Sequence, residues 1–507
     1  MSMEYFLGID VGTTGCKVVL IDEEGRLLGR GVEEYPLYTP RPNWAEQDPL
    51  SWWQGTQKAL EKVLASSGVN PRDVAGIGLT GQMHGSVFLD REGRVLRPAI
   101  LWCDQRTALE CQQITETVGF ERIMEINCNP VLAGFTAPKI QWVKNNEPEI
   151  YRQIDKVLLP KDYIRFCLTG DFATDVSDAS GTSLFDVPRR RWSEELITTL
   201  GYQVSWFPPS FESPEITGYL KPEIARQFGF REKVAVVAGG GDNAAGAIGT
   251  GIVAEGLVSA SLGTSGVVFA FSAEVKVDMK GRVHTFCHAV PGKWHVMGVM
   301  LSAGGSLRWF RDVLGMEEKN LASLLGMDAY ELLSQEAEKA LPGAEGLIFL
   351  PYLTGERTPH ADPYARGVFF GVTLKHRKNE LVRAVMEGVT FGMRDSFEII
   401  AEMGIPVREV RAIGGGARSA LWRKIQAAVY QVPLSLLLVD EGPAFGAALL
   451  AGVGNRAFQS VEEACKKAVK VVERIEPDPE WVNLYQGIYQ VYRDLYPALR
   501  EFYRRVT

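Results

Sequence analysis

Two short glycine-rich turns of the same design occur half a chain length apart. Residues 12–15 read Gly-Thr-Thr-Gly and separate the β-rich runs 5–7 and 16–21. Residues 263–266 read Gly-Thr-Ser-Gly and separate two apolar runs within 257–271. Each pattern predicts two strands joined by a tight turn. The recurrence predicts two domains built on one plan, although a chance similarity of two turns would give the same pattern.

Apolar runs between and after these turns are typical of an α/β fold, in which strands alternate with amphipathic helices. The expected strands are 74–79, 86–89, 157–159, 234–238, 347–350 and 409–413. The expected helices are 51–64 and 378–399, with a closing helix at 482–505. Because proline lacks a backbone donor, we expect this last helix to be kinked or broken at Pro497.

The length of 507 residues exceeds what one compact core normally holds. We place a domain boundary near Ile252, between domains of residues 1–252 and 253–507. The net charge of -8 argues against a sequence-independent nucleic-acid binder, which needs a basic face. Seven scattered cysteines without a C-x-x-C pair, no secretion signal and no long apolar run predict a cytoplasmic protein without a membrane partner.

The first turn is a candidate phosphate cradle. Its glycines let the backbone approach a polyphosphate, and the hydroxyls of Thr13 and Thr14 can donate to phosphate oxygens. Asp10, at the end of the preceding strand, can hold Mg²⁺ through water. The G-x-x-x-x-G-K-[ST] spacing is absent, so a P-loop is not supported. An ordinary tight hairpin is the alternative for this segment alone.

A second candidate is the glycine run 239–241, followed by Asp242 at the start of a small-residue helix. A carboxylate at this position can accept a proton from a substrate hydroxyl during phosphoryl transfer. The alternative to a catalytic role is that Asp242 only caps the N-terminus of the helix. The run also matches a dinucleotide fingerprint, but Gly263 stands where the ribose-binding acid is expected.

A third glycine cluster, at 414–416, follows a predicted strand, and bare backbone there could receive a flat adenine. A tight strand-to-helix turn is the structural alternative. His284, Cys287, His288 and His295 look like a metal cluster, but the rise of a strand would separate His284 from His288 by roughly 13 Å. A zinc site is therefore not expected.

The order of these motifs resembles the FGGY carbohydrate kinases, over nearly the whole chain. Further matching stretches are 135–142, 159–163, 175–182 and 284–302. The resemblance implies an actin-like, ribonuclease H-like duplicated two-domain α/β ATPase fold with an interdomain catalytic cleft. It also implies the use of ATP and Mg²⁺, a sugar substrate, and no nucleic-acid partner, while a homodimer stays open.

Within that family, the Thr-Gly-Gln-Met-His-Gly segment at 80–85 resembles the xylulokinase branch, which implies phosphorylation of D-xylulose to its 5-phosphate. The resemblance makes Asp242 the proton acceptor and Asp10 the residue for the metal-nucleotide. It places around the sugar Met83, His84, Asp104, Arg106 and Asn243. It assigns to the phosphates Thr13, Thr14, Lys17, Gly263, Thr264 and Ser265, and to the adenosine Gly415 and Gly416.

One position departs from that branch: Cys103 precedes Asp104 where an asparagine is usual. The departure leaves open another ketose or a polyol as the acceptor. Arg106 could also be a salt-bridge partner of Asp104 with no sugar contact. An actin-like ATP-driven assembly protein is the alternative from a different class, but it would give Asp242 and the Met-His pair no role.

Overall fold

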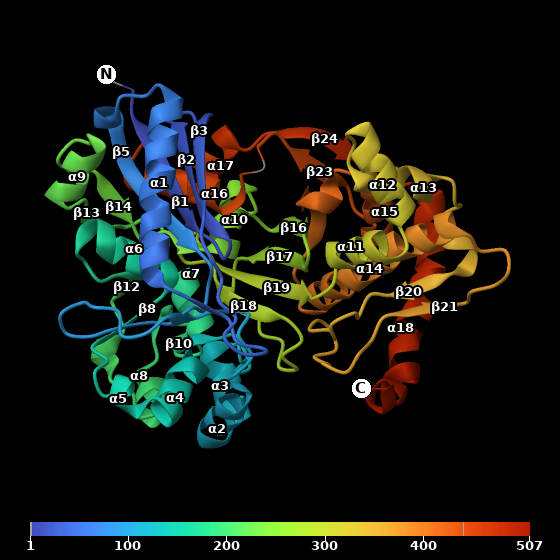
Figure 1. Ribbon diagram of the computed structural model, residues 1–507, viewed down its shortest axis with the longest axis horizontal. Helices are drawn as coiled ribbons and strands as arrows, with labels where there is room; N and C mark the ends of the chain where they lie inside the picture. The colour runs from blue at the N-terminus through green and yellow to red at the C-terminus, as the bar shows by residue number, and fades with distance from the viewer. Residues whose placement is uncertain (1–2, 440, 507) are drawn as a thin grey trace.

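The computed structural model describes residues 3–439 and 441–506, and it contains two seven-stranded mixed sheets that lie side by side (Figure 1). The first sheet has the order β13-β14-β5-β1-β2-β3, with β15 also paired to β5. Its strands are β1 (Tyr5–Val11), β2 (Gly15–Asp22), β3 (Leu27–Glu34), β5 (Val74–Gly81), β13 (Ile216–Tyr219), β14 (Ala235–Val237) and β15 (Gly240–Gly241).

The second sheet has the order β18-β19-β17-β16-β22-β23-β24. Its strands are β16 (Gly256–Leu262), β17 (Gly266–Ser272), β18 (His284–Cys287), β19 (Trp294–Met300), β22 (Val407–Ile413), β23 (Leu434–Leu437) and β24 (Val471–Ile475). The small pairs are formed by β4 (Glu46–Gln47), β6 (Val87–Leu89), β7 (Ala99–Ile100), β8 (Lys156–Leu158), β9 (Thr174–Asp175), β10 (Phe185–Asp186), β11 (Arg191–Trp192), β12 (Ser210–Phe211), β20 (Ile348–Leu350) and β21 (Val368–Phe370).

The centres of the two sheets repeat one arrangement. The predicted hairpins are β1–β2 and β16–β17, and both are antiparallel. The strand on the other side of each hairpin is parallel to its first strand: β5 beside β1, and β22 beside β16. This repetition confirms the duplicated α/β fold that was expected from the two glycine-rich turns.

Helices cover both sheets. The helices up to residue 249 are α1 (Pro49–Ser67), α2 (Ala108–Val118), α3 (Phe120–Asn127), α4 (Thr136–Asn146), α5 (Pro148–Tyr151), α6 (Pro160–Thr169), α7 (Val176–Ala179), α8 (Glu194–Thr199), α9 (Pro222–Phe228) and α10 (Asp242–Gly249). The later helices are α11 (Gly304–Val313), α12 (Met316–Leu325), α13 (Ala329–Glu338), α14 (Lys378–Glu402), α15 (Ala420–Tyr430), α16 (Gly442–Gly454), α17 (Val461–Ala468) and α18 (Pro479–Val506). In residues 3–439 and 441–506, no helix is both long and apolar enough to cross a membrane.

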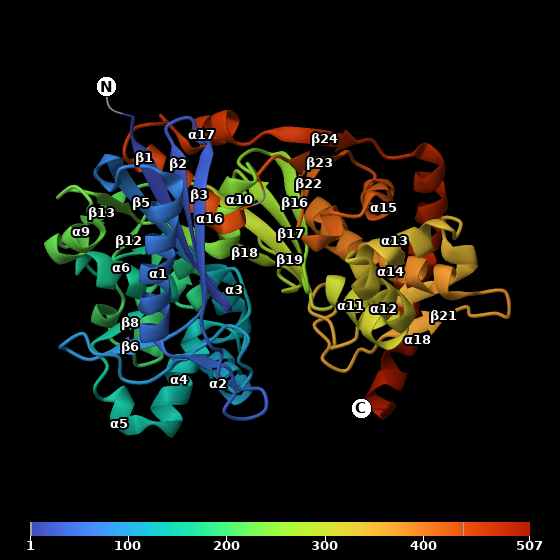
Figure 2. The ribbon, with the colours of Figure 1, turned by 45° about the horizontal axis from the view of Figure 1, so that its top comes forward.

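The chain returns to the first sheet after it has built most of the second. Helices α16 and α17, red in Figure 2, lie beside the blue strands of the first sheet. A Cβ atom at Gly8 of β1 or Gly78 of β5 would overlap a backbone carbonyl oxygen of α16. Gly446 of α16 is equally close to the carbonyl of Ala245 in α10. Glycine and alanine residues of α16 therefore let it pack closely against both α10 and the first sheet.

The closing helix α18 is continuous from Pro479 to Val506, so it is not broken at Pro497, and the kink expected as the other outcome stays a prediction. Buried tyrosines bind the helix to the body on both sides of the proline. Tyr489 donates a hydrogen bond to Asp395 at 2.6 Å, and Tyr496 donates one to Asp362 at 2.8 Å. We attribute the continuity to these contacts, which offset the backbone hydrogen bond that proline cannot make.

Candidate active site

Asp10 and Asp242 stand at the ends of β1 and β15, two strands of the first sheet that both pair with β5. Asp10 pairs with Thr80 of β5, and β15, which immediately precedes Asp242, pairs with the end of the same strand. The side-chain atom Oδ1 of Asp10 is enclosed and has no hydrogen-bond partner. Burial raises the pKa of Asp10 to about 7, the nearby Asp242 adds to that rise, and Lys17 opposes it. The structure thus brings two acids of the predicted site together.

Asp242 is the first residue of α10, and its carboxylate does not cap the helix, whose N-cap is Gly241. The N-cap alternative is therefore wrong. The backbone N–H and the side-chain amide of Asn243 donate to Oδ1 of Asp242 at 2.7 and 2.9 Å. Burial raises the pKa of Asp242 to about 6, and these hydrogen bonds limit the rise. Such a pKa suits a group that accepts a proton near neutral pH.

Side chains from three elements hold the first glycine-rich turn. Tyr35 donates to the carbonyl oxygen of Gly12 at 2.6 Å, and Gln47 donates to that of Thr13 at 2.7 Å. The indole N–H of Trp102 donates to the Thr13 hydroxyl oxygen at 2.9 Å. Thr14 is exposed at the tip of the turn. The turn is thus rigid, and its tip is accessible.

The second turn lies against the start of α11. The backbone N–H of Gly304 donates to Gly263 at 2.8 Å, and that of Gly305 donates to Thr264 at 3.0 Å. Gly263, Thr264 and Ser265 are exposed. Arg308 donates to the hydroxyl oxygen of Thr264 at 3.0 Å, which adds a positive charge beside the turn.

The third glycine cluster lies beside the second turn. Ile413 at the end of β22 pairs with Ser261 of β16. A Cβ atom on Gly416 would come within 2.5 Å of the Leu262 side chain, so only glycine fits without rearrangement. The residues assigned to the adenosine and three of those assigned to the phosphates therefore lie side by side at one end of the second sheet.

Lys17 projects from β2 and forms an ion pair with Glu441 at 3.3 Å. Arg30 also pairs with Glu441, at 3.2 Å. Glu441 is the N-cap residue of α16. This places Lys17 at the junction between the first sheet and the returning helix, and its contact with phosphate stays a prediction.

Met83 and His84 lie next to β15, the strand that immediately precedes Asp242. A Cβ atom on Gly241 would come within 2.9 Å of the Met83 sulfur. His84 Nδ1 is 2.6 Å from the carbonyl oxygen of Gly181, and its ring stacks on Phe135 with centroids 4.4 Å apart. Burial lowers the pKa of His84 to about 3, so the ring is neutral. Three of the five residues predicted to surround the sugar are thus grouped around β15.

The backbone of His84 has φ 67°, which is unusual for a residue with a side chain. Lys139 and Thr136 of α4 stabilise this conformation by donating to the His84 carbonyl oxygen at 2.7 and 3.1 Å. Backbone strain of this kind persists where the surroundings impose it, often at functional sites. The stretch 135–142, which matched the family by sequence, therefore serves to hold His84.

Asp104 and Arg106 form a buried ion network. Arg106 donates to Asp104 at 2.7 to 3.0 Å, and its Nη1 lies 2.7 Å from Glu46. Its guanidinium also lies 3.6 Å above the ring of Trp44. The Asp104 side chain is fully buried, and that of Arg106 is 1% exposed. This is the ion pair that the sequence left as an alternative, and sugar contact by either residue stays a prediction.

A buried lysine that sequence analysis did not single out is linked to the site through a network of hydrogen bonds and ion pairs. Lys161 lies 2.5 Å from Asp162 and 2.9 Å from Asp175, with all three side chains enclosed. Asp175 accepts from Ser177, whose hydroxyl oxygen accepts the N–H of Gly241 at 3.0 Å. The stretches 159–163 and 175–182 matched the family by sequence. Charged residues in otherwise apolar segments were the available signal of a buried network.

The histidines of the second sheet are packed among aromatic rings. His295 stacks on Phe269 with centroids 4.1 Å apart, and His288 Nε2 is 3.0 Å from the carbonyl oxygen of Ile252. Within the described part of the chain, no group of three or more His, Cys, Asp or Glu residues is arranged to hold a metal ion.

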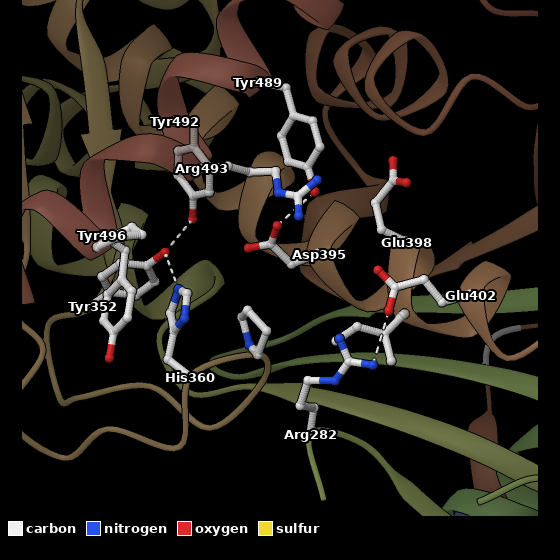
Figure 3. A pocket seen from close by; sticks show the side chains of 13 residues that line it. Arg282, Tyr352, His360, Asp395, Glu398, Glu402, Tyr489, Tyr492, Arg493 and Tyr496 are labelled. Atoms are coloured by element: carbon white, nitrogen blue, oxygen red, sulfur yellow. Dashed lines mark hydrogen bonds and ion pairs between the residues drawn. The ribbon is translucent and has the colours of Figure 1, made fainter. Parts of the chain in front are cut away.

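A separate cavity of about 310 Å³ lies between α14, α18 and the segment that follows β20 (Figure 3). Tyr352, His360, Asp395 and Arg493 line it, and none of the predicted site residues does. Tyr352 lies within hydrogen-bonding distance of His360, at 3.2 Å. The cavity is therefore distinct from the residues assembled around Asp242.

Comparisons with known proteins agree with this arrangement. Residues 5–249 match the N-terminal domain of the FGGY family of carbohydrate kinases, and residues 258–454 match its C-terminal domain. The xylulose kinase of Escherichia coli (strain K12) is 44% identical over 495 residues, which cover 97% of this chain and 99% of the relative.

Two solved structures extend the comparison. A xylulose kinase structure from Brucella ovis has 39% identity and a TM-score of 0.91, and covers 98% of this chain and 100% of its own. A gluconate kinase structure from Lactobacillus acidophilus has 25% identity and a TM-score of 0.92, with 100% coverage of both chains. These similarities confirm the expected actin-like two-domain α/β fold.

Proposed function

The chain belongs to the FGGY family of carbohydrate kinases, and from that premise we propose that it transfers the γ-phosphoryl group of ATP to the terminal hydroxyl of D-xylulose. The product is D-xylulose 5-phosphate. The observation that carries the proposal is the grouping of Asp242 with Asp10, Met83 and His84. Full-length relatives that are xylulose kinases support the choice of sugar.

Asp242 acts as the general base. Its pKa of about 6 leaves it ionised at neutral pH and still basic enough to accept the proton of the attacking hydroxyl. Asn243 holds the carboxylate through its two hydrogen bonds and keeps one oxygen available for the sugar. Phosphoryl transfer needs little covalent chemistry from the protein, so this alignment is the main contribution of the first sheet.

Asp10 is suited to a magnesium ion. Its enclosed Oδ1 has no partner in the protein, and oxygen is the ligand atom that Mg²⁺ prefers. Mg²⁺, when bound, neutralises charge on the polyphosphate and orients it. Asp10 then remains ionised and holds that position through water.

His84 and Asn243 bind the sugar hydroxyls. Neutral His84 has Nδ1 on the Gly181 carbonyl, so Nδ1 carries the proton and Nε2 is left as an acceptor. Met83 provides an apolar surface of the site next to Gly241. The strained backbone of His84 fixes the ring direction before the sugar arrives.

We assign the base and the sugar contacts to the domain of residues 1–252 and the nucleotide to the domain of residues 253–507. Gly415 and Gly416 receive the adenosine, and the two glycine-rich turns hold the phosphates from opposite sides. Closure of the domains excludes water, which would otherwise compete with the sugar as acceptor.

A sugar panel tests the function. ADP release is measured with MgATP and D-xylulose, L-xylulose, D-ribulose, L-ribulose, xylitol or glycerol. We expect strong stimulation by D-xylulose. Activity with another member alone would keep the kinase and overturn the sugar. If no sugar stimulated ATP hydrolysis, or if the protein formed filaments that depend on nucleotide, the actin-like assembly protein would be favoured instead.

The assembly and the location of the protein are proposals as well. Helix α12 carries exposed apolar side chains, with Leu321, Leu324 and Leu325 at 47, 84 and 58% exposure. Such a surface suits contact with a second copy, so we propose a homodimer. Light scattering measures the mass of the particle in solution, and a monomeric mass at micromolar concentration would contradict the homodimer.

We expect the protein to act in the cytoplasm, where free cysteines stay reduced.

A further inference from the structure

One arginine outside the predicted site lies beside the second sheet, close to the first domain. Arg357 lies in the segment that follows β20, where Thr358 is fixed to the sheet at two points. The Thr358 hydroxyl oxygen accepts the N–H of Val299 at 3.0 Å, and its O–H donates to the carbonyl oxygen of Arg282 at 2.8 Å. The segment therefore has little freedom to move relative to β19.

This anchor lies at the place where the second sheet meets the first domain. His284 pairs with Met297, so Arg282 and Val299 each lie two residues further along the sheet. The His284 ring is 5.9 Å from Phe135, on which His84 stacks. Asn129 also exchanges hydrogen bonds with the neighbouring Thr285, at 2.7 and 3.0 Å. Arg357 is thus connected through Thr358 and β18 to the aromatic rings that pack against His84, a residue assigned to the sugar.

The guanidinium of Arg357 makes no hydrogen bond or ion pair with any described residue, although its side chain is partly buried. The carboxylate of the neighbouring Glu356 accepts the backbone N–H groups of Arg357, at 2.7 Å, and of Leu301, and no hydrogen bond from the Arg357 guanidinium. Burial lowers the pKa of Arg357 and the charge of Glu356 opposes that fall, so a ligand oxygen that accepts from the guanidinium would replace the water it has lost.

Arg357 is near His84, since its positive charge contributes to the lowered pKa values of His84 and His284. Thr358 fixes Arg357 to the second sheet, whereas Asp242 follows β15 of the first sheet. We therefore assign Arg357 to the end of the sugar site that is away from Asp242. In a ketopentose phosphorylated at O5, that end carries C1 and the C2 carbonyl.

We propose that Arg357 is a specificity-determining residue that donates hydrogen bonds to the C2 carbonyl oxygen of the ketose. This inference rests on the proposed function and names the chemical group that the second domain recognises. A guanidinium has donors and no acceptor, so it suits a carbonyl oxygen. The hydroxyl of a polyol at C2 also brings a proton, for which Arg357 offers no acceptor. The residue therefore favours ketoses over the matching polyols.

The test compares Arg357→Met and Arg357→Lys with wild type. Dissociation constants for D-xylulose and xylitol are measured by calorimetry with a nonhydrolysable ATP analogue present, so that both domains can close. Loss of a charged hydrogen bond should weaken D-xylulose binding by about 10- to 100-fold in Arg357→Met. Xylitol binding should change by less than about threefold, and Arg357→Lys should keep part of the preference.

Arg366→Met is the matched control, because Arg366 lies on the same segment and donates only to the carbonyls of Pro363 and Ala365. It should leave both constants unchanged. Equal weakening for both ligands in Arg357→Met, or no change for either, would overturn the proposal. If wild type prefers another ketose, the same ratio with that ketose and its own alditol tests Arg357 independently of the D-xylulose assignment.

Discussion

The two glycine-rich turns share a sheet arrangement but differ in what holds them. Side chains of Tyr35, Gln47 and Trp102 hold the turn between β1 and β2. Backbone groups at the start of α11 hold the turn between β16 and β17. In the first, Val11 pairs with Cys16, whereas in the second Leu262 already pairs with Gly266, so the second connection is shorter.

The difference extends to charge. Two residues before the first glycine of each turn stand Asp10 and Ser261, and five residues after it stand Lys17 and Val268. The first hairpin therefore carries an acid and a base where the second carries a hydroxyl and an apolar side chain. The two hairpins therefore share a backbone arrangement, but only the first has ionisable groups at these two positions.

The largest effect should follow from removing the base. Asp242→Asn keeps the shape of the side chain and removes its ability to accept a proton, so kcat should fall by about 10²- to 10⁴-fold. Steady-state ADP release measures kcat, and calorimetry should find the sugar dissociation constant within about threefold of wild type. Turnover near the wild-type rate would remove Asp242 from this role and place the chemistry elsewhere.

Paired substitutions at equivalent positions test the comparison of the hairpins next. Asp10→Asn should lower kcat by roughly 10- to 100-fold, the size expected when a charge-assisted contact is lost. Ser261→Ala, its counterpart in the second hairpin, should change kcat by less than about threefold. Titration of each variant with Mg²⁺ locates the defect, since only Asp10→Asn should need more metal. Equal losses in both variants would show that the halves share the chemistry.

The pH dependence should be smaller and specific to the first domain. Because the base must be ionised, wild-type kcat should be full above the Asp242 pKa of about 6 and should fall as the pH drops through it. Asn243→Ala removes the side-chain donor that lowers this pKa. The acid limb should then move to higher pH, with kcat at pH 6 reduced by about two- to tenfold at saturating sugar. An unchanged limb would mean that another group controls it.

The smallest effect is expected at Cys103. This residue lies beside Trp102, which binds the first turn, and Asp104, which is already satisfied by Arg106. Cys103→Asn should therefore change kcat/KM for D-xylulose by less than about threefold. A gain above about tenfold would show that the sugar site requires the asparagine that xylulokinases usually carry there.

Much of this arrangement could be predicted from the sequence. Glycine spacing located both hairpins and the turn at Gly415. The family resemblance assigned Asp10 and Asp242 to one site, and acids that follow buried parallel strands do converge at one edge of a sheet. The N-cap alternative for Asp242 failed because Gly241 already occupies that position.

Other features depend on contacts between distant segments. The glycines at positions 8 and 78 carry no sign that α16 will return to cover them. The partner of Arg106 was foreseen in Asp104, but Glu46 joins from a strand far away in sequence. Proline predicted a kink or a break in α18, and the helix continues through Pro497, where buried tyrosines bind it on both sides. Arg357 carries no motif that separates it from an ordinary surface arginine.

The most direct test of the central claim is the position of the phosphate on the product. Phosphorus NMR of the reaction with ATP and D-xylulose should show one new monoester, coupled to the two protons of C5. That result would agree with Asp242 at the terminal hydroxyl and the carbonyl at the far end of the site. A monoester on C1, or no sugar phosphate at all, would contradict the account.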